Sequence, residues 1–213
     1  MNKYTTYKRR GFTLIELLIS VAIIGVLTAL VTVKYKAFDS TTLLKGAAYE
    51  IALTIREAQV KSISAVRSTA GFDYPRGVSV TPAPGSTPTT ASKTYLAFQF
   101  RDSSLPPYND IADSDPDVAT ILGTSTLDRS IYVSDVCVNP GNDCTPSGID
   151  ISFRRPEFKA LFHGRNSSGV NFTPAQDEAI SDVTIKVTSS NNTANVFLVT
   201  VSQLGQITVS KQP

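Results

Sequence analysis

The most prominent feature in the pattern of hydrophobic and polar positions is one long apolar run near the N-terminus. Residues 12–33 form 22 consecutive positions whose only ionisable side chain is that of Glu16. As a helix this run extends roughly 33 Å, enough to cross about 30 Å of hydrocarbon. A secretory signal has a shorter apolar run, followed by a small-residue cleavage site that this sequence does not show. The pattern therefore predicts a membrane-spanning helix.

Beyond the apolar run, small and apolar residues recur at intervals of three and four, which is the spacing of one helix face. These positions are Leu44, Ala48, Ile51, Ile55, Ala58, Ser62 and Val66. Charged side chains occupy the other faces, and Glu57 and Lys61 are spaced for an i to i+4 ion pair. We expect the helix to continue to about Ser68 and to end before Gly71 and Pro75.

From residue 77 the period changes to that of strands. Residues 77–88 are rich in Pro, Thr and Ser and predict a loop with one short strand. Alternating positions then predict strands over 95–100, 131–136, 149–153, 158–162, 183–187, 195–201 and 206–209. One long helix followed by six or seven short strands indicates the α+β class, with an antiparallel sheet packed on the helical stripe.

The charge balance and the rare residues exclude several classes of protein. The chain has 20 basic and 18 acidic residues, and four of the basic ones lie in the first eleven positions with no acid among them. This near balance does not favour nucleic acid or anionic lipid as the main partner. Two cysteines, one methionine and one histidine leave few ligands for soft metals or haem. Without a nucleotide-binding or nucleophile-elbow motif, we expect no enzymatic activity and no cofactor.

Gly11 lies directly before the apolar run and Glu16 lies inside it. A carboxylate at the centre of a membrane helix costs roughly 2.5 to 3.5 kcal/mol on insertion scales, so Glu16 needs a shallow depth or a partner. One interpretation is that its carboxylate reaches the lipid headgroups. The other is that cleavage after Gly11 gives Phe12 a free amino group, with which Glu16 pairs in the same or a neighbouring chain.

The segment Lys8–Leu17, KRRGFTLIEL, followed by an apolar run containing Gly25, resembles the class III signal of type IV pilins and type II secretion pseudopilins. The resemblance implies that a prepilin peptidase cleaves between Gly11 and Phe12 and that the new amine of Phe12 is methylated. It also implies that Glu16 attracts the N-terminal amine of an adjoining subunit during filament assembly.

The same resemblance implies a domain organisation. Residues 1–11 are a cleaved basic leader, 12–33 a transmembrane and filament-core helix, 34–70 its amphipathic continuation, and 71–213 a globular, β-rich, pilin-like domain. The expected protein crosses the cytoplasmic membrane once, with its globular domain outside the cytoplasm, and then enters a filament. Its expected partners are other pilin or pseudopilin subunits, the prepilin peptidase and an inner-membrane assembly platform.

The expected function is that of a structural subunit of a type IV pilus or of a type II secretion pseudopilus. The later half also resembles the GspH and FimT type of minor pseudopilin and minor pilin. This resemblance is carried by a strand over Ile151–Phe153 followed by Pro156, and by the terminal strand pair within 199–209. The alternative function is therefore a minor or tip pilin that binds DNA, a surface or a secreted substrate.

Cys137 and Cys144 enclose a turn-rich loop, Val-Asn-Pro-Gly-Asn-Asp, on the side expected to lie outside the cytoplasm. Disulfides form in such compartments, and we predict a bridge between these two cysteines. A metal pair is the less favoured alternative, because no histidine or third cysteine is close in sequence. Pilins often carry a disulfide in a surface loop, which agrees with the bridge.

An acid-rich stretch contains Asp113, Asp115 and Asp117, whose carboxylates are suitable oxygen ligands for calcium. The stretch is not an EF-hand, since Val118 and Thr124 stand where that loop needs Gly and Glu. We favour a solvated loop and keep a calcium ion as the alternative.

The basic cluster of the mature body consists of Arg154, Arg155, Lys159, His163 and Arg165. An exposed cluster of this kind is suited to phosphate contacts with DNA. The other interpretation is that these charges protect an exposed strand edge from aggregation. We favour the second interpretation and keep DNA contact by Arg154, Arg155, Lys159 and Arg165 as the alternative.

Overall fold

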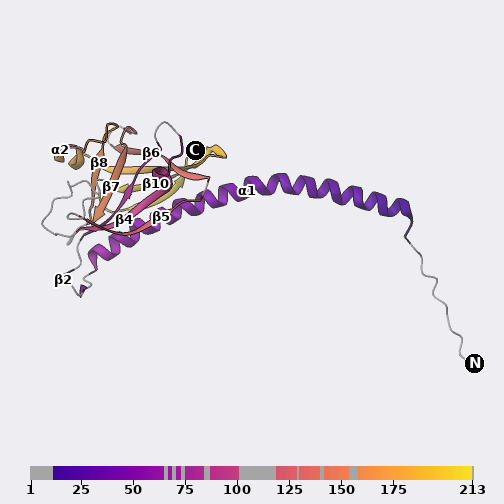
Figure 1. Cartoon of the computed structure of the whole chain (residues 1–213), viewed down its shortest axis with the longest axis horizontal. Helices are drawn as coiled ribbons and strands as arrows, with labels where there is room; N and C mark the ends of the chain where they lie inside the picture. Colours follow the sequence, from indigo (N-terminus) through magenta and orange to yellow (C-terminus); the bar gives the residue numbers. More distant parts are fainter. Residues whose placement is uncertain are drawn as a thin grey trace, which may run out of the picture. The chain divides into compact units, whose positions relative to one another are not determined.

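The computed structural model describes residues 12–64, 67–68, 71–72, 75–83, 87–100, 119–128, 130–139, 142–153 and 158–212. The side chains of residues 31–40, 67–68, 71–72, 100, 119 and 174 are not described. The chain, drawn in Figure 1, divides into two units, Met1–Ser40 and Thr41–Pro213.

Helix α1, Leu14–Ile63, is continuous over 50 residues, which confirms the predicted long helix. Its predicted end near Ser68 is wrong, because the backbone of β1, Arg67–Ser68, pairs with β2, Gly71–Phe72, instead of continuing the helix. The helix end is joined to the strand that begins at Arg76, since the Ser62 hydroxyl accepts a 2.8 Å hydrogen bond from the N–H of Arg76.

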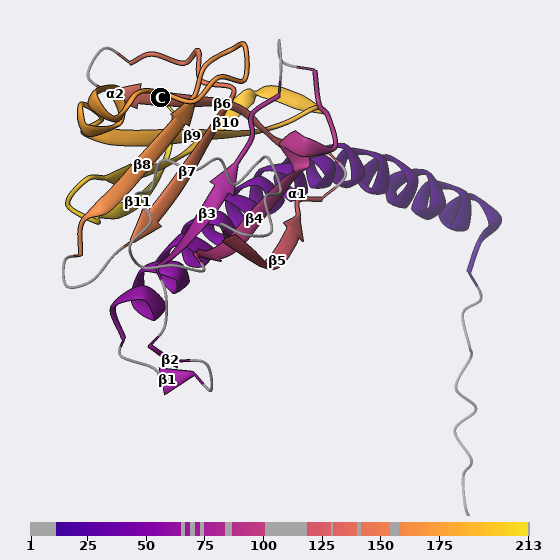
Figure 2. The ribbon, with the colours of Figure 1, turned by 60° about the vertical axis from the view of Figure 1, so that its left-hand side comes forward.

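The strands form two larger antiparallel sheets (Figure 2). The first has the order β5-β4-β3-β7-β8, with bounds Ala119–Thr126, Thr94–Phe100, Arg76–Val80, Gly148–Phe153 and Ala160–Arg165. The second has the order β11-β10-β9-β6, with bounds Ile207–Lys211, Asn192–Ser202, Asp182–Ser189 and Ile131–Asn139. Two short helices, η2 (Ala91–Lys93) and α2 (Pro174–Glu178), complete the fold. The α+β class is confirmed, but the strands form two sheets where one was expected.

Most predicted strands are confirmed, including the β7–β8 hairpin and the turn between β10 and β11. Strand β5 was not predicted. Its pairing with β4 contains a bulge, since Ala97 pairs with Gly123 whereas Phe98 pairs with Ile121. The extra residue, Leu122, breaks the two-residue alternation, and both Ile121 and Leu122 are exposed.

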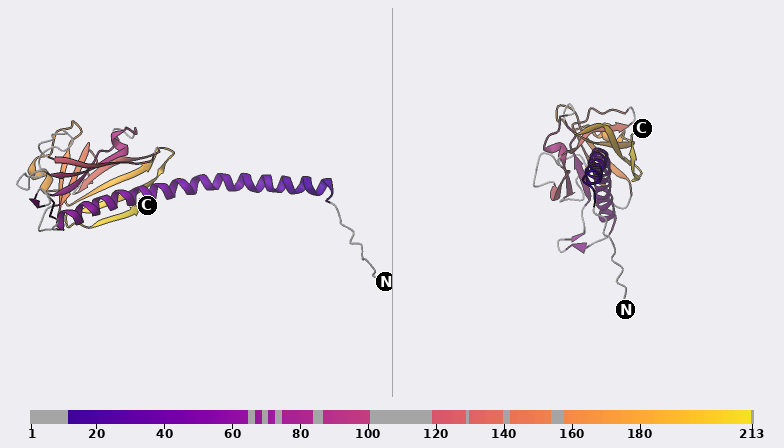
Figure 3. Two further views of the ribbon diagram at one scale, coloured as in Figure 1. Left: turned by 60° about the horizontal axis from the view of Figure 1, so that its bottom comes forward. Right: turned by 90° about the vertical axis from the view of Figure 1, so that its right-hand side faces the viewer.

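The predicted helical stripe is the face of α1 that enters the core. Leu44, Ala48, Ile51 and Ile55 are fully buried in one apolar cluster with side chains from both sheets. In the views of Figure 3 this part of α1 lies against the strands. Each isoleucine so buried contributes about 1.5 to 3 kcal/mol relative to an exposed one, so the stripe is a major source of stability. Val66 lies outside the described residues.

Buried or partly buried polar contacts join α1 to a strand and to loops of the second unit. The buried Gln59 amide donates to the carbonyl oxygens of Gly205, at 3.0 Å, and Phe158, at 3.4 Å. The phenol of Tyr95 on β4 donates at 2.9 Å to the Glu50 carboxylate. Burial raises the pKa of Tyr95 above its ordinary value of 10.0, and the neighbouring Glu50 charge adds to the rise.

Candidate functional site

The start of α1 contains the residues predicted to act in processing and assembly. Gly11 lies outside the described residues, and Phe12 is exposed. The Thr13 hydroxyl accepts from the N–H of Glu16 and donates to its carboxylate, both at 3.4 Å. Thr13-Leu14-Ile15-Glu16 thus follows the T-x-x-E capping pattern, and an acid in the first turn also favours the helix dipole. The sequence analysis missed this local role of Glu16, although the pattern is visible in the sequence.

Between Phe12 and Leu30, a range that includes the first part of α1, large apolar side chains are exposed on every side of the helix. All of the large apolar side chains in this range are at least 51% exposed in the single chain. Its hydroxyls are satisfied within the helix, because Ser20 donates to the carbonyl of Glu16 and Thr28 to that of Ile24. This exposed segment therefore favours an apolar environment.

Within the described part of the chain, no helix has both the length and the apolar character needed to cross a membrane. The membrane span over 12–33 stays a prediction.

In the second unit, α1 also has an apolar surface on the face opposite its core stripe. Tyr49, Leu53 and Val60 are exposed there, and Leu53 is 68% exposed. The ammonium of Lys45 lies 5.8 Å from the centre of the Tyr49 ring. The Lys45 side chain therefore lies over part of this face. An amphipathic helix that needed only its own domain would be polar at these positions.

Cys137 and Cys144 form the predicted disulfide. The loop between them is also closed by the backbone, since Val138 and Asp143 exchange N–H to carbonyl hydrogen bonds of 2.7 and 2.9 Å. The ammonium of Lys186 on β9 lies 3.6 Å from the sulfur of Cys144.

Asp113, Asp115 and Asp117 lie outside the described residues. Elsewhere, in the ranges that the structure does describe, no group of three or more His, Cys, Asp or Glu side chains is placed to hold a metal ion. A calcium ion in the acid-rich stretch stays a prediction.

The basic cluster is divided by the fold. Arg154 and Arg155 lie outside the described residues, and Lys159 is exposed. Arg165 is only 7% exposed, so its predicted availability for DNA contact is wrong. The register of β7 and β8 explains this, because Gly148 stands opposite Arg165 and leaves room for its guanidinium, which lies 3.8 Å from the carboxylate of Asp150.

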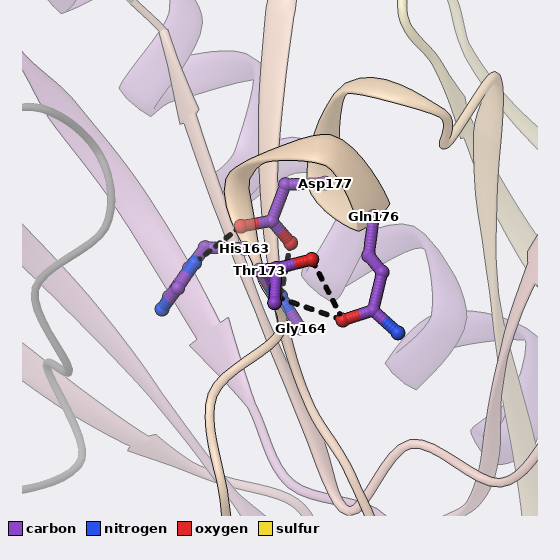
Figure 4. Close-up of polar contacts among 5 residues, drawn as sticks. All are labelled: His163, Gly164, Thr173, Gln176 and Asp177. Carbon is purple, nitrogen blue, oxygen red and sulfur yellow. Dashed lines mark hydrogen bonds and ion pairs between the residues drawn. The ribbon is translucent and has the colours of Figure 1, made fainter.

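His163, the single histidine of the sequence, is also buried, at 2% exposure. Its Nδ1 lies 2.6 Å from Oδ2 of Asp177 on α2, and the N–H of Gly164 donates at 3.0 Å to Oδ1 of the same carboxylate (Figure 4). Thr173 caps α2 through hydrogen bonds from its N–H and hydroxyl to the Gln176 amide oxygen, at 2.8 and 3.1 Å. The Asp177 carboxylate therefore anchors α2 on β8, and His163 is part of that anchor.

Comparison with known proteins bears on the N-terminal segment. The family model of the prokaryotic N-terminal methylation motif matches residues 6–32. No curated protein and no solved structure matches the chain. The resemblance of the later half to the GspH and FimT type stays a prediction. The range matched by the methylation motif includes Gly11, Phe12, Glu16 and most of the apolar run, and the cleavage and methylation sites stay predictions. The N-terminal segment therefore carries the prokaryotic methylation motif, which is the class III signal of type IV pilins and pseudopilins.

Proposed function

We propose that the mature chain is a structural subunit of a type IV pilus or a type II secretion pseudopilus. Cleavage between Gly11 and Phe12 frees the amine of Phe12, and the N-terminal helix then carries the subunit from the cytoplasmic membrane into a filament. The observation that supports this most is the methylation motif over residues 6–32, which leads into a helix with apolar side chains exposed on all sides.

The exposed apolar surface favours a polymer over a lone anchored domain. Surfaces of this size mark contacts with lipid or with other proteins. Lipid suffices for residues 12–30 before assembly, but Leu53 and Val60 extend the apolar surface into the part of α1 that packs on the sheets. Neighbouring helices in a filament are suited to cover both parts, and repeated head-to-tail contacts of this type generate an open helical array.

Glu16 is the residue that we expect to set the register between subunits. Its contacts with Thr13 are hydrogen bonds with a neutral hydroxyl and do not neutralise its charge. A carboxylate in apolar surroundings is costly without a cation, and the amine created at Phe12 supplies one on each neighbouring subunit.

Two substitutions of Glu16 separate its charge from its capping role. Glu16→Ala removes both, whereas Glu16→Gln removes the charge and keeps a side chain that fits the capping pattern. We expect both variants to insert and to be cleaved, with Phe12 as the first residue, and both to be missing from sheared filaments. Glu57→Gln is the matched control, because Glu57 is an exposed acid of α1 paired with Lys61, and it should assemble normally. Normal incorporation of Glu16→Gln would refute the register role.

The alternative, a minor or tip pilin that binds DNA, has less support. Arg165 is buried beside Asp150, and His163 is engaged by Asp177, so these two members of the basic cluster offer no exposed charge to a phosphate. A gel-shift assay of full-length protein with DNA, with and without substitution of Arg154 and Arg155, tests whether the rest of the basic cluster binds DNA.

A further inference from the structure

The two sulfurs of the disulfide have different surroundings. Cys137 belongs to β6 and is 1% exposed. Cys144 belongs to the loop, is only partly buried, and lines a cavity of about 620 Å³. The cavity is walled by Pro82 and Pro146 and by the side chains of Thr81, Ser134 and Ser167. A reagent from solvent therefore reaches Cys144 from this cavity, and Cys137 is not among the residues that line it.

The charges near the two sulfurs differ as well. Lys186, whose ammonium is 3.6 Å from the Cys144 sulfur, stands opposite Asp135 in the β6–β9 register. Two acids are also close to this region. Asp135 lines the cavity, and the carboxylate of Asp143 accepts a 2.9 Å hydrogen bond from the N–H of Thr145. In the reduced chain an ammonium beside a thiol stabilises the reactive thiolate, whereas burial opposes the charged form. Both effects favour Cys144 over Cys137 as the nucleophile.

The backbone holds the loop in place without the help of the sulfurs. Val138 and Asp143 are joined by two hydrogen bonds, and the side chain of Asn139 accepts a third, at 3.0 Å, from the N–H of Asn142. Because none of these contacts involves a sulfur, we expect them to hold the two cysteines close together in the reduced chain as well. Closure of the bridge is then an intramolecular step with a high effective concentration.

We propose that Cys144 is the sulfur through which an extracytoplasmic thiol–disulfide oxidoreductase forms this bridge. The Cys144 thiolate attacks the partner's disulfide, which gives a mixed disulfide at Cys144 and releases one partner thiolate. The Cys137 thiolate then attacks the Cys144 sulfur, which closes the bridge and releases the second partner thiolate. The two protons lost by the cysteines end on the two partner thiols, and the partner disulfide accepts the two electrons. The extracytoplasmic location rests on the proposed function, whereas the order of attack does not.

Oxidised glutathione is a suitable probe for the order of attack. The full-length chain, reduced in detergent micelles, is treated briefly with it, quenched with acid and mapped by mass spectrometry. In the wild type Cys137 closes the bridge soon after the adduct forms, so we expect the adduct that the acid quench traps to lie on Cys144. In single-thiol variants, the adduct should form at least about tenfold faster on Cys144 in Cys137→Ala than on Cys137 in Cys144→Ala. In concentrated urea the two rates should converge, because the difference comes from the fold.

The role of Lys186 is tested in the Cys137→Ala background. Lys186→Met should slow adduct formation severalfold, whereas Lys159→Met, which removes an exposed ammonium elsewhere, should leave the rate unchanged. An adduct found mainly on Cys137 of the wild type, or equal rates for the two lysine variants, would overturn the proposal. These rates do not depend on filament assembly, so a failure here and a failure of the proposed function are distinguishable.

Discussion

Removal of the Asp177 carboxylate is expected to destabilise the globular unit strongly. The change Asp177→Ala leaves the buried His163 imidazole and the N–H of Gly164 without their acceptor. Each buried donor left without its acceptor costs about 1 to 3 kcal/mol, so the two together cost about 2 to 6 kcal/mol. In a domain of this size each kcal/mol lowers Tm by about 2 to 4 °C, so we expect a decrease of about 4 to 24 °C.

Thermal and urea unfolding of the full-length protein in detergent measure the effect. Glu178→Ala is the matched control, because Glu178 is the next residue of the same short helix and is exposed. It should change the free energy of unfolding by no more than about 0.5 kcal/mol. The loss of unfolding free energy in Asp177→Asn should lie between those of Asp177→Ala and Glu178→Ala, since the amide retains one oxygen acceptor. An Asp177→Ala variant within about 1 kcal/mol of the wild type would refute the assignment of His163 and Asp177 as an anchor.

Two further predictions concern alkaline stability and processing. The raised pKa of Tyr95 means that the folded state favours the neutral phenol, so its contribution to stability is present below pH 10.0 and is lost as the pH rises through the folded-state value. Urea unfolding at pH 8 and pH 11 should therefore show a smaller alkaline loss for Tyr95→Phe than for the wild type, and equal losses would contradict the role of this phenol. For Gly11→Leu, mass spectrometry of membranes should find the full-length, unmethylated chain. A product of normal mature mass would exclude cleavage at this bond.

The local features of the fold were predictable from the sequence, whereas the pairing of distant elements was not. The three-and-four spacing from Leu44 to Ser62 identifies the buried helix face because that period is a property of one helix alone. The bulge at Leu122 interrupts the alternation of side chains along β5, so the pattern of this segment did not predict a strand. The end of α1 at Ile63 depends on a competing strand pair, which local propensity does not report.

The candidate sites follow the same division. The N-terminal methylation motif is contiguous in sequence and was predicted, as was the disulfide between Cys137 and Cys144. The burial of Arg165 depends on its position opposite Gly148, and the partner of His163 lies 14 residues away on α2. A single sequence contains no register between strands, so a basic cluster that is continuous in sequence was taken as continuous on the surface.

The pairing of β6 with β9 has a consequence for biosynthesis. Ile131 at the start of β6 lies opposite Ser189 at the end of β9, and the strands between them in sequence belong to the other sheet. The four-stranded sheet therefore cannot close until nearly the whole polypeptide has been synthesised. Until then the valines of β6 and the core face of α1 lack their cover, so the incomplete chain exposes apolar surface that chaperones or rapid completion must protect from aggregation.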